Sequence, residues 1–390
     1  MKKFSCLFSR ERGQHEPDKQ LVGIVMAILA FGLISLSSAS SVIAYAKFGD
    51  AYYYFKHQLI GLSLGLISFW VFSRIDYHIW RRWAFGFLVI SIALLLLVFI
   101  PGLSATYGRA RSWINIFGFS LQPSEFVKIS FLLYLAAWLE SRRERLHEVS
   151  QGIGPFIIIL GLITFLMLLQ PDLGTLIIIA ITSLVVYFVG GGKFSHIFII
   201  VLIGLLSFSF LLVFTPLKSD NSNGNNYRLN RLKCWLNPEA DIKYACYQIN
   251  QSLIAVGSGG IFGRGWGASR QKYLYLPEVS GDSIFAIIAE EIGLVFSGLL
   301  ILGYLFFFYR SYLIAKHAPD DFGRNLAVGI ASWLVLQAII NIGGIINLVL
   351  MTGVPLPFIS YGGSSIVTSM ISIGVILNIY MRRKRIDYDI

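Results

Sequence analysis

Apolar residues in this chain fall in long runs, and charged residues collect at the ends of those runs. The runs are about 18 to 26 residues long, the length that a helix needs to cross the hydrocarbon core of a bilayer. They predict ten transmembrane helices, near residues 21–46, 56–73, 84–101, 123–140, 153–169, 173–190, 195–216, 283–309, 325–350 and 362–381. The pattern therefore predicts an all-α polytopic membrane protein.

Composition and charge support this interpretation. Of the 390 residues, 56% are hydrophobic and 14% are charged, whereas about a quarter of a soluble domain is charged. The formal net charge is +11, but the basic residues lie at the ends of the apolar runs, where short cytoplasmic loops collect Lys and Arg. We therefore expect no nucleic-acid partner.

The distribution of Lys and Arg also predicts an orientation. Most of them lie on one side of the membrane if the N-terminus is cytoplasmic, and both termini are then cytoplasmic. The expected organisation is a cytoplasmic segment 1–20, a membrane domain 21–381 with one large extracytoplasmic loop at about 217–282, and a basic cytoplasmic tail 382–390.

Recognisable motifs concentrate on the predicted outer side. They are Arg111-Ser112-Trp113-Ile114, Gln122-Pro123-Ser124-Glu125, Gln170-Pro171-Asp172, Tyr227-Arg228-Leu229-Asn230-Arg231, Tyr247-Gln248, Gln251-Ser252, Gly281-Asp282-Ser283 and Leu356-Pro357-Phe358-Ile359-Ser360-Tyr361-Gly362-Gly363-Ser364-Ser365. In order and content they resemble the FtsW/RodA/SpoVE (SEDS) peptidoglycan glycosyltransferases, and the glycine-rich motifs look closer to FtsW than to RodA. One departure is that Ser280 and Gly281 stand where the family usually has His-Thr, so any role of that His is absent or relocated.

The resemblance implies polymerisation of lipid II at the outer face of the bacterial cytoplasmic membrane, in septal synthesis during cell division. An acceptor 4-hydroxyl attacks the anomeric carbon, the lipid diphosphate leaves, and the linkage inverts. The implied partners are lipid II, the nascent glycan strand, membrane lipid, a class B penicillin-binding protein transpeptidase, and divisome or elongasome proteins. The resemblance is also compatible with a divalent cation, Mg²⁺ or Mn²⁺, that bridges the diphosphate and Asp282.

Asp282 is marked by the resemblance as the catalytic aspartate. A carboxylate with a reference pKa of about 3.9 is ionised at neutral pH and accepts a proton from the attacking hydroxyl. The alternative is a helix N-cap, because Asp immediately before an apolar helix commonly has that role.

Glu125 and Lys128 lie three residues apart on one face of the fourth predicted span. Charges inside a membrane are costly and usually face a cavity or a partner. We expect Lys128 to contact the diphosphate, with Glu125 as its partner. A structural ion pair is the alternative.

Basic outer loops suit a substrate that carries a diphosphate. The substrate-binding candidates that fall within matched motifs are Trp113, Arg111, Arg228, Arg231, Gln251, Ser252 and Ser360. Solvated loop charge or attraction to anionic lipid is the alternative for the arginines, and an interfacial anchor is the alternative for Trp113.

Glu290 and Glu291 lie about two turns into the eighth predicted span, where at least one should face the bundle interior. This acidic pair also resembles a proton relay, which keeps a lipid II flippase as a rival function. A non-catalytic scaffold of the cell-wall machinery is the second rival.

Cys234 and Cys246 lie in the same outer loop, whereas Cys6 is cytoplasmic. We expect a disulfide in an oxidising envelope compartment. Two free thiols are the alternative, because spacing alone does not show whether the Cβ atoms approach. No cluster has metal-ligand spacing, and no metal site of the protein is expected.

Overall fold

The computed structural model describes residues 16–100, 104–107, 110–116, 119–170, 172–214, 227–241, 244 and 246–383. These residues form thirteen α-helices. The long ones are α2 (Lys19–Phe48), α3 (Tyr53–Arg74), α5 (Ala84–Leu97), α6 (Pro123–Ser141), α7 (Gly154–Leu169), α8 (Leu173–Val189), α9 (Phe194–Phe214), α12 (Ile284–Lys316), α13 (Asp321–Ile345) and α14 (Gly363–Met381). The short ones are α4 (Tyr77–Arg82), α10 (Tyr227–Leu236) and α11 (Tyr247–Gly259).

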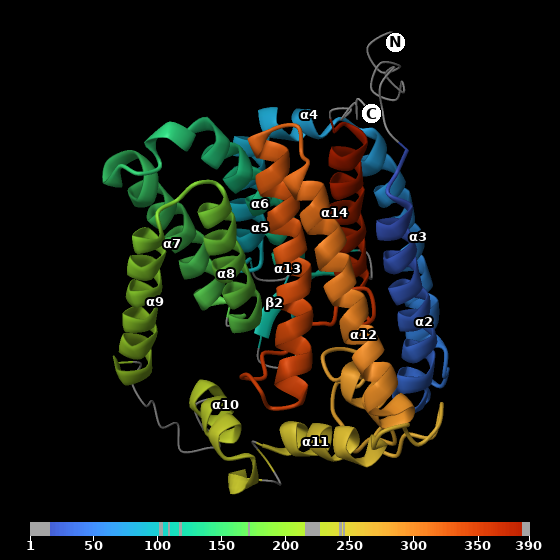
Figure 1. The fold of residues 1–390 in the computed structure, drawn as a ribbon. Coiled ribbons are helices and arrows are strands. Elements are labelled where there is room, and N and C mark those ends of the chain that lie inside the picture. Colours follow the sequence, from blue (N-terminus) through green and yellow to red (C-terminus); the bar gives the residue numbers. More distant parts are fainter. Residues whose placement is uncertain are drawn as a thin grey trace.

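The long helices run side by side as a bundle, with α4 at one end and α10 and α11 at the other (Figure 1). Each of the ten apolar runs identified in the sequence overlaps one long helix, although the run 325–350 extends five residues beyond the end of α13. Within the described residues, six helical segments are long and apolar enough to cross a membrane. Helix α6, which carries the charged residues Glu125, Lys128 and Glu140, is not among them. The chain is an all-helical polytopic membrane protein in its main architecture.

A small sheet departs from the predicted all-α class. Strands β1 (Ser104–Tyr107), β2 (Ala110–Ile116) and β3 (Phe119–Leu121) pair antiparallel in that order. The cause lies in the sequence, where Gly108 and Gly118 separate short segments containing Tyr, Trp, Ile and Phe, a composition that favours hairpins. The sheet contacts the start of α6 and α14.

Burial separates the central helices from those at the periphery. In α13 and α14, 78% of the most apolar stretch is buried, compared with 17% in α3. Helices α3 and α14 nevertheless pack closely, because a Cβ on Gly61 would lie 3.1 Å from Gly363 Cα, and one on Gly374 would lie 2.8 Å from Phe69 O. Small residues permit such close helix packing in membranes.

A non-helical segment, residues 346–362, joins α13 to α14 and packs inside the bundle. Phe358 and Ile359 contact α2 at Gly32, where a Cβ would lie 2.7 Å from Phe358 O. Non-helical backbone is tolerated inside a membrane bundle only if other protein groups form hydrogen bonds with its N–H and C=O groups. Gln58 meets that need by donating to Ser360 O (3.1 Å) and accepting from Gly362 N (3.1 Å), and Tyr304 Oη donates to Pro357 O.

Helix α12 is broken at Gly293, although the sequence predicts a continuous span over 283–309. Gly293 has φ 74° and ψ −174°, a conformation that favours glycine. A Cβ there would lie 2.2 Å from Gly263 N. The break divides α12 into a short first half after Asp282 and a long second half that ends at Lys316.

Candidate active site

Asp282 lies immediately before α12, where three other parts of the chain converge on it. Its Oδ1 accepts hydrogen bonds from Gln248 Nε2 of α11 (3.2 Å) and from Ser283 Oγ (3.2 Å). Its Oδ2 faces Gly353, where a Cβ would lie 3.3 Å away, and the same Cβ would lie 3.7 Å from Arg231 Nη2 of α10. The carboxylate and the guanidinium therefore meet at a glycine that leaves them room.

Main-chain contacts hold this position. Asn341 of α13 donates from Nδ2 to Asp282 O and to Val354 O, both at 2.8 Å. Ser360 Oγ donates to Gly281 O (2.7 Å), and Arg231 Nη1 donates to Met351 O (2.9 Å). The carboxylate is thus oriented by α10, α11, α13 and the 346–362 segment together.

The carboxylate does not cap the helix that follows. The N-cap position of α12 is Ser283, and no side chain there accepts from the helix backbone. Among the described contacts of Asp282, the side chain accepts from Gln248 and Ser283 rather than from the first turn. The N-cap interpretation of Asp282 is therefore not supported.

Asp282 is half-buried, and its pKa is raised to about 6. Loss of hydration is the main cause, and the negative charge of Glu278 adds to it. Arg231 and the hydrogen bonds from Ser283 and Gln248 act in the opposite direction. A carboxyl of pKa about 6 is mostly ionised at neutral pH and remains basic enough to accept a proton.

A second polar group is buried on α6. Lys128 Nζ donates to Glu125 Oε1 and to Gln337 Oε1 of α13, both at 2.7 Å. The Lys128 and Glu125 side chains are 2% and 1% exposed. Lys128 also lies 4.7 Å from the ring centre of Trp333, whose Nε1 donates to Gln337 Oε1. Lys128, Trp333, Thr182 and other side chains line a small cavity.

The two groups are connected through α13. Gln337 donates from Nε2 to Pro355 O (2.9 Å), and Asn341, one turn later, holds Val354 O and Asp282 O. One helical face therefore positions Lys128 on one side and the Asp282 backbone on the other. Sequence reasoning missed Gln337 and Asn341, although two amides four residues apart in an apolar helix were a signal for them. Gln248 falls within the Tyr247-Gln248 motif but was not among the predicted site residues.

The remaining predicted site residues differ in burial and in their contacts. Ser252 is fully buried and donates to Gln248 O of its own helix (2.9 Å), and Ser360 is buried against Gly281 and Leu356. Their hydroxyls bond to the protein backbone in this structure, and their predicted roles in substrate binding stay predictions. Gln251 is half-buried on α11, and Trp113 is half-buried on β2 opposite Ala105. The side chains of Arg111 and Arg228 lie outside the described residues.

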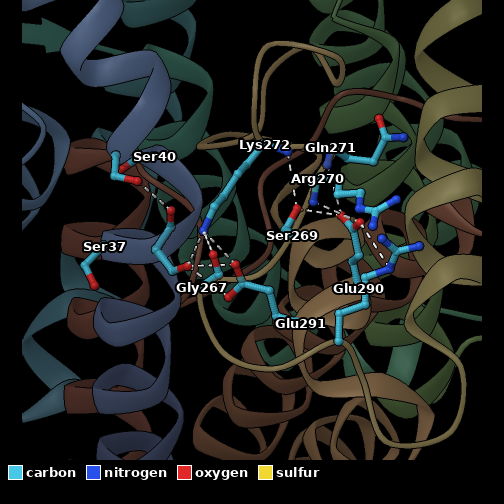
Figure 2. A network of polar contacts seen from close by, with 12 residues as sticks. Ser37, Ser40, Gly267, Ser269, Arg270, Gln271, Lys272, Glu290 and Glu291 are labelled. Atoms are coloured by element: carbon cyan, nitrogen blue, oxygen red, sulfur yellow. Dashed lines mark hydrogen bonds and ion pairs between the residues drawn. The ribbon is translucent and has the colours of Figure 1, made fainter.

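Glu290 and Glu291 belong to a separate network, which Figure 2 shows. Glu290 accepts from Ser269 Oγ (2.5 Å), Arg270 N (3.0 Å) and Gln271 N (3.2 Å). Glu291 accepts from Lys272 Nζ at 3.0 Å. Both glutamates are buried, as expected, but most of their partners are in the loop between α11 and α12, joined by Ser38 of α2 at Glu291 and Ser258 of α11 at Glu290.

Cys234 and Cys246 form a disulfide with a Cα–Cα distance of 5.2 Å. It ties the end of α10, which carries Arg231, to the start of α11, which carries Gln248. A closed loop of this length stabilises a fold by about 2–4 kcal/mol in the chain-entropy model.

In the described part of the chain, no three His, Cys, Asp or Glu side chains group as metal ligands. Asp282 offers one carboxylate beside the Arg231 cation, so the protein alone does not fit a divalent ion well.

Comparisons with known proteins agree over nearly the whole chain. A family model described as "Cell cycle protein" (FtsW, RodA, SpoVE) matches residues 19–385. Stage V sporulation protein E of Bacillus subtilis is 40% identical over 93% of this chain and 96% of its own length. A probable peptidoglycan glycosyltransferase FtsW of Trichlorobacter lovleyi is 39% identical over 93% of each chain.

Solved structures show the same fold. A chain from a peptidoglycan synthase complex, from work on the coordination of polymerization and crosslinking, superimposes with a TM-score of 0.75 at 26% identity, covering 93% of this chain and 97% of that one. The rod shape determining protein RodA of Thermus thermophilus gives 0.68 at 26% identity, covering 95% and 98%. This chain therefore belongs to the FtsW/RodA/SpoVE family of cell cycle proteins.

Proposed function

We propose that the protein is a peptidoglycan glycosyltransferase that polymerises lipid II, with Asp282 as the catalytic base. The observation that carries this proposal is the half-buried Asp282 carboxylate, held by Gln248 and facing Gly353 beside Arg231. A raised pKa with an adjacent guanidinium suits a group that must accept a proton next to an anionic substrate. The names of the relatives, among them probable peptidoglycan glycosyltransferases, support the same reaction.

The reaction assigns a role to each charged group. The 4-hydroxyl of the acceptor disaccharide attacks the anomeric carbon of a polyprenyl-diphosphate-linked glycan, its proton passes to Asp282, and the diphosphate leaves with inversion from α to β. Arg231 offsets the negative charge that gathers at the diphosphate. Lys128 is the candidate contact for the diphosphate from the α6 side, and Glu125 holds it in place.

The proposal includes the membrane topology. Ten long helices cross the bacterial cytoplasmic membrane, both termini are cytoplasmic, and the large loop that contains α10 and α11 lies outside. Residues 1–20 and 382–390 flank the membrane domain 21–381. The excess of Lys and Arg at the opposite end of the bundle supports this orientation.

We extend the proposal to septal synthesis and to a class B penicillin-binding protein as partner. The similarity to FtsW proteins supports the first. The second is supported by the structural neighbour from a peptidoglycan synthase complex, because that work concerns polymerization together with crosslinking.

The decisive experiment is lipid II polymerisation by purified Asp282→Asn protein, with and without its transpeptidase partner. The exchange is nearly isosteric, so we expect a folded protein whose glycan synthesis falls by at least about a hundredfold, the usual range for loss of a general base. Glu239→Gln, an exposed acid in the same outer loop, serves as the matched control and should polymerise normally. Glycan strands of normal length and yield from Asp282→Asn would exclude the base assignment.

The same variant separates the rival functions. A flippase without polymerase activity should move lipid II across vesicles equally well with or without the Asp282→Asn exchange, and a scaffold should be indifferent to the exchange in cells. Loss of polymerisation by a folded variant favours the enzyme.

A further inference from the structure

An exposed apolar surface lies on the segment 260–275, between α11 and α12, where the proposed chemistry makes no use of it. Six large side chains contribute to it, namely Phe262 (76% exposed), Leu274 (61%), Ile261 (60%), Tyr273 (58%), Tyr275 (56%) and Trp266 (48%). Exposed apolar side chains gathered in one segment usually mark an interaction site.

The segment is held rigidly against the break in α12. Leu294 N donates to Gly260 O (3.0 Å), and Val295 N donates to Ile261 O (3.2 Å). In the opposite direction, Arg264 N donates to Glu290 O at 3.0 Å. The backbone of the segment therefore replaces the helical hydrogen bonds that the break at Gly293 leaves open.

Buried carboxylates fix it further, as Figure 2 shows. Glu290 accepts from Ser269 Oγ and from two backbone N–H groups of the segment. Lys272 Nζ donates to Glu291 Oε1 (3.0 Å) and to Ser38 Oγ of α2 (3.2 Å). The segment that carries the exposed apolar side chains is thus held in place by these hydrogen bonds.

The position of the 260–275 segment relative to the membrane can be judged from its contact with α2. Asp18 caps the first turn of α2 and pairs with Arg310 of α12, which places a charged boundary at that end of both helices. Ser38 lies twenty residues after Asp18, a rise of about 30 Å at about 1.5 Å per residue. That length equals the thickness of a bilayer hydrocarbon core, about 30 Å. The Ser38–Lys272–Glu291 contact therefore lies about one hydrocarbon-core thickness along α2 from that charged end.

The apolar surface continues directly into the lipid-facing side of α12. Leu294 is 70% exposed, Phe296 53% and Leu299 55%, and the first of these is hydrogen bonded to the segment. The Trp266 ring meets Phe31 of α2 edge-on, with ring centres 6.3 Å apart. Arg270 is exposed in the same segment, as is Arg264, whose Nε pairs with Glu290 Oε1 (3.8 Å). Aromatic rings and arginines are the residues that gather at the headgroup level of a bilayer.

We propose that the 260–275 segment is seated in the phospholipid headgroup region, with its apolar side chains at the acyl boundary and Arg264 and Arg270 at the lipid phosphates. The assignment to the outer leaflet rests on the proposed topology, whereas the seating itself does not. The contact sets the height of α12, and hence of Asp282 eight residues before Glu290, relative to a substrate whose diphosphate lies at the same lipid surface.

The test is the depth of a fluorescent label in proteoliposomes, measured in a Cys6→Ser background in which Cys234 and Cys246 stay disulfide-bonded. NBD is attached at Phe262→Cys or, as a second position, Tyr273→Cys. Leu299→Cys serves as the lipid-exposed reference and Glu144→Cys as the aqueous one. We expect blue-shifted emission at both test positions. Lipids with a nitroxide near the glycerol end of the acyl chain should quench it more strongly than lipids with a nitroxide at the chain terminus.

Emission as red as that at Glu144, with quenching by aqueous iodide, would overturn the proposal. So would a label that becomes shielded only when a transpeptidase partner is added, since the surface would then be a protein interface. Neither result depends on polymerase activity, so the outcome is separate from the test of Asp282.

Discussion

Two charged groups at the centre of this protein differ in solvation, and the difference separates their roles. Asp282 is half-buried and faces a guanidinium across an open glycine position. Lys128 and Glu125 are almost completely buried and bound to each other. A carboxylate that keeps some access to water exchanges protons readily, whereas a buried ion pair is costly to disturb.

The raised pKa of Asp282 predicts the acid limb of the activity. Only the ionised carboxylate accepts a proton, so polymerisation should rise with pH through about 6 and level off above it. Well below that pH the rate should fall about tenfold per pH unit. The measurement is kcat/KM for lipid II between acidic and neutral pH.

Glu278 provides the control for this pH dependence. It is exposed, and its negative charge helps to raise the pKa of Asp282. In Glu278→Gln we expect the acid limb to shift to lower pH while the plateau keeps its height. An unshifted limb would indicate that another group governs the titration.

Lys128→Ala should lower activity more than Arg270→Ala, because a cation shielded from water interacts more strongly with a diphosphate than one on an exposed loop. Removing one member of a buried pair also destabilises a fold by about 3–5 kcal/mol. Lipid II polymerisation and thermal unfolding in detergent should therefore be measured together.

The double variant Lys128→Met with Glu125→Gln separates the two effects. It leaves no unpaired buried charge, so stability should largely return while activity stays low. Recovery of activity together with stability would assign the pair a structural role only.

At the level of secondary-structure elements, non-helical segments of the backbone position the residues around Asp282. The break in α12 receives the 260–275 segment, and the 346–362 segment enters the bundle, where Gln58, Gln337 and Asn341 bond to its backbone. Polar side chains inside apolar helices are costly. Here they satisfy the peptide groups that a regular helix would satisfy itself.

Gly293→Ala should therefore be strongly destabilising. The residue has a positive φ, and its Cβ would lie 2.2 Å from Gly263 N, so the close contact and the backbone strain act together. Gly298→Ala in the same helix meets nothing within 4 Å and should be neutral or slightly stabilising. Thermal unfolding of the two variants, measured in parallel, checks this, and equal melting temperatures would contradict it.

At the level of the whole molecule, the buried helices α13 and α14 form the centre, and α3 and the outer side of α12 face lipid. Apolar exposure on this scale is stable only in a bilayer. The orientation of the bundle in that bilayer follows from charge alone, which makes it testable independently of catalysis.

Cysteine accessibility in intact cells should confirm the topology. In a Cys6→Ser background, Lys47→Cys in the last turn of α2 should react with a membrane-impermeant maleimide added outside. Glu144→Cys should react only after the membrane is permeabilised. Both positions are exposed and lie at opposite ends of the bundle. The reverse pattern would invert the proposed orientation and remove the site from the outer face.

The helical bundle and the family can both be inferred from the amino-acid sequence alone. Runs of apolar residues have the length of a bilayer, and neither local propensity nor packing competes with that signal, so all ten runs appear as helices. The motifs marked Asp282, helical spacing paired Glu125 with Lys128, and a shared outer loop paired the two cysteines that the structure joins.

The contacts between these helices and loops are seen only in the three-dimensional fold. Hydropathy does not register a single glycine at positive φ, so the break at Gly293 was not expected, and the three short strands were too brief to oppose the helical pattern. The convergence of Arg231, Gln248, Asn341 and Gly353 on Asp282 joins residues up to 122 positions apart. Spacing in the sequence carries no information about such contacts, because they arise where irregular segments fold back into the bundle to satisfy their own peptide groups.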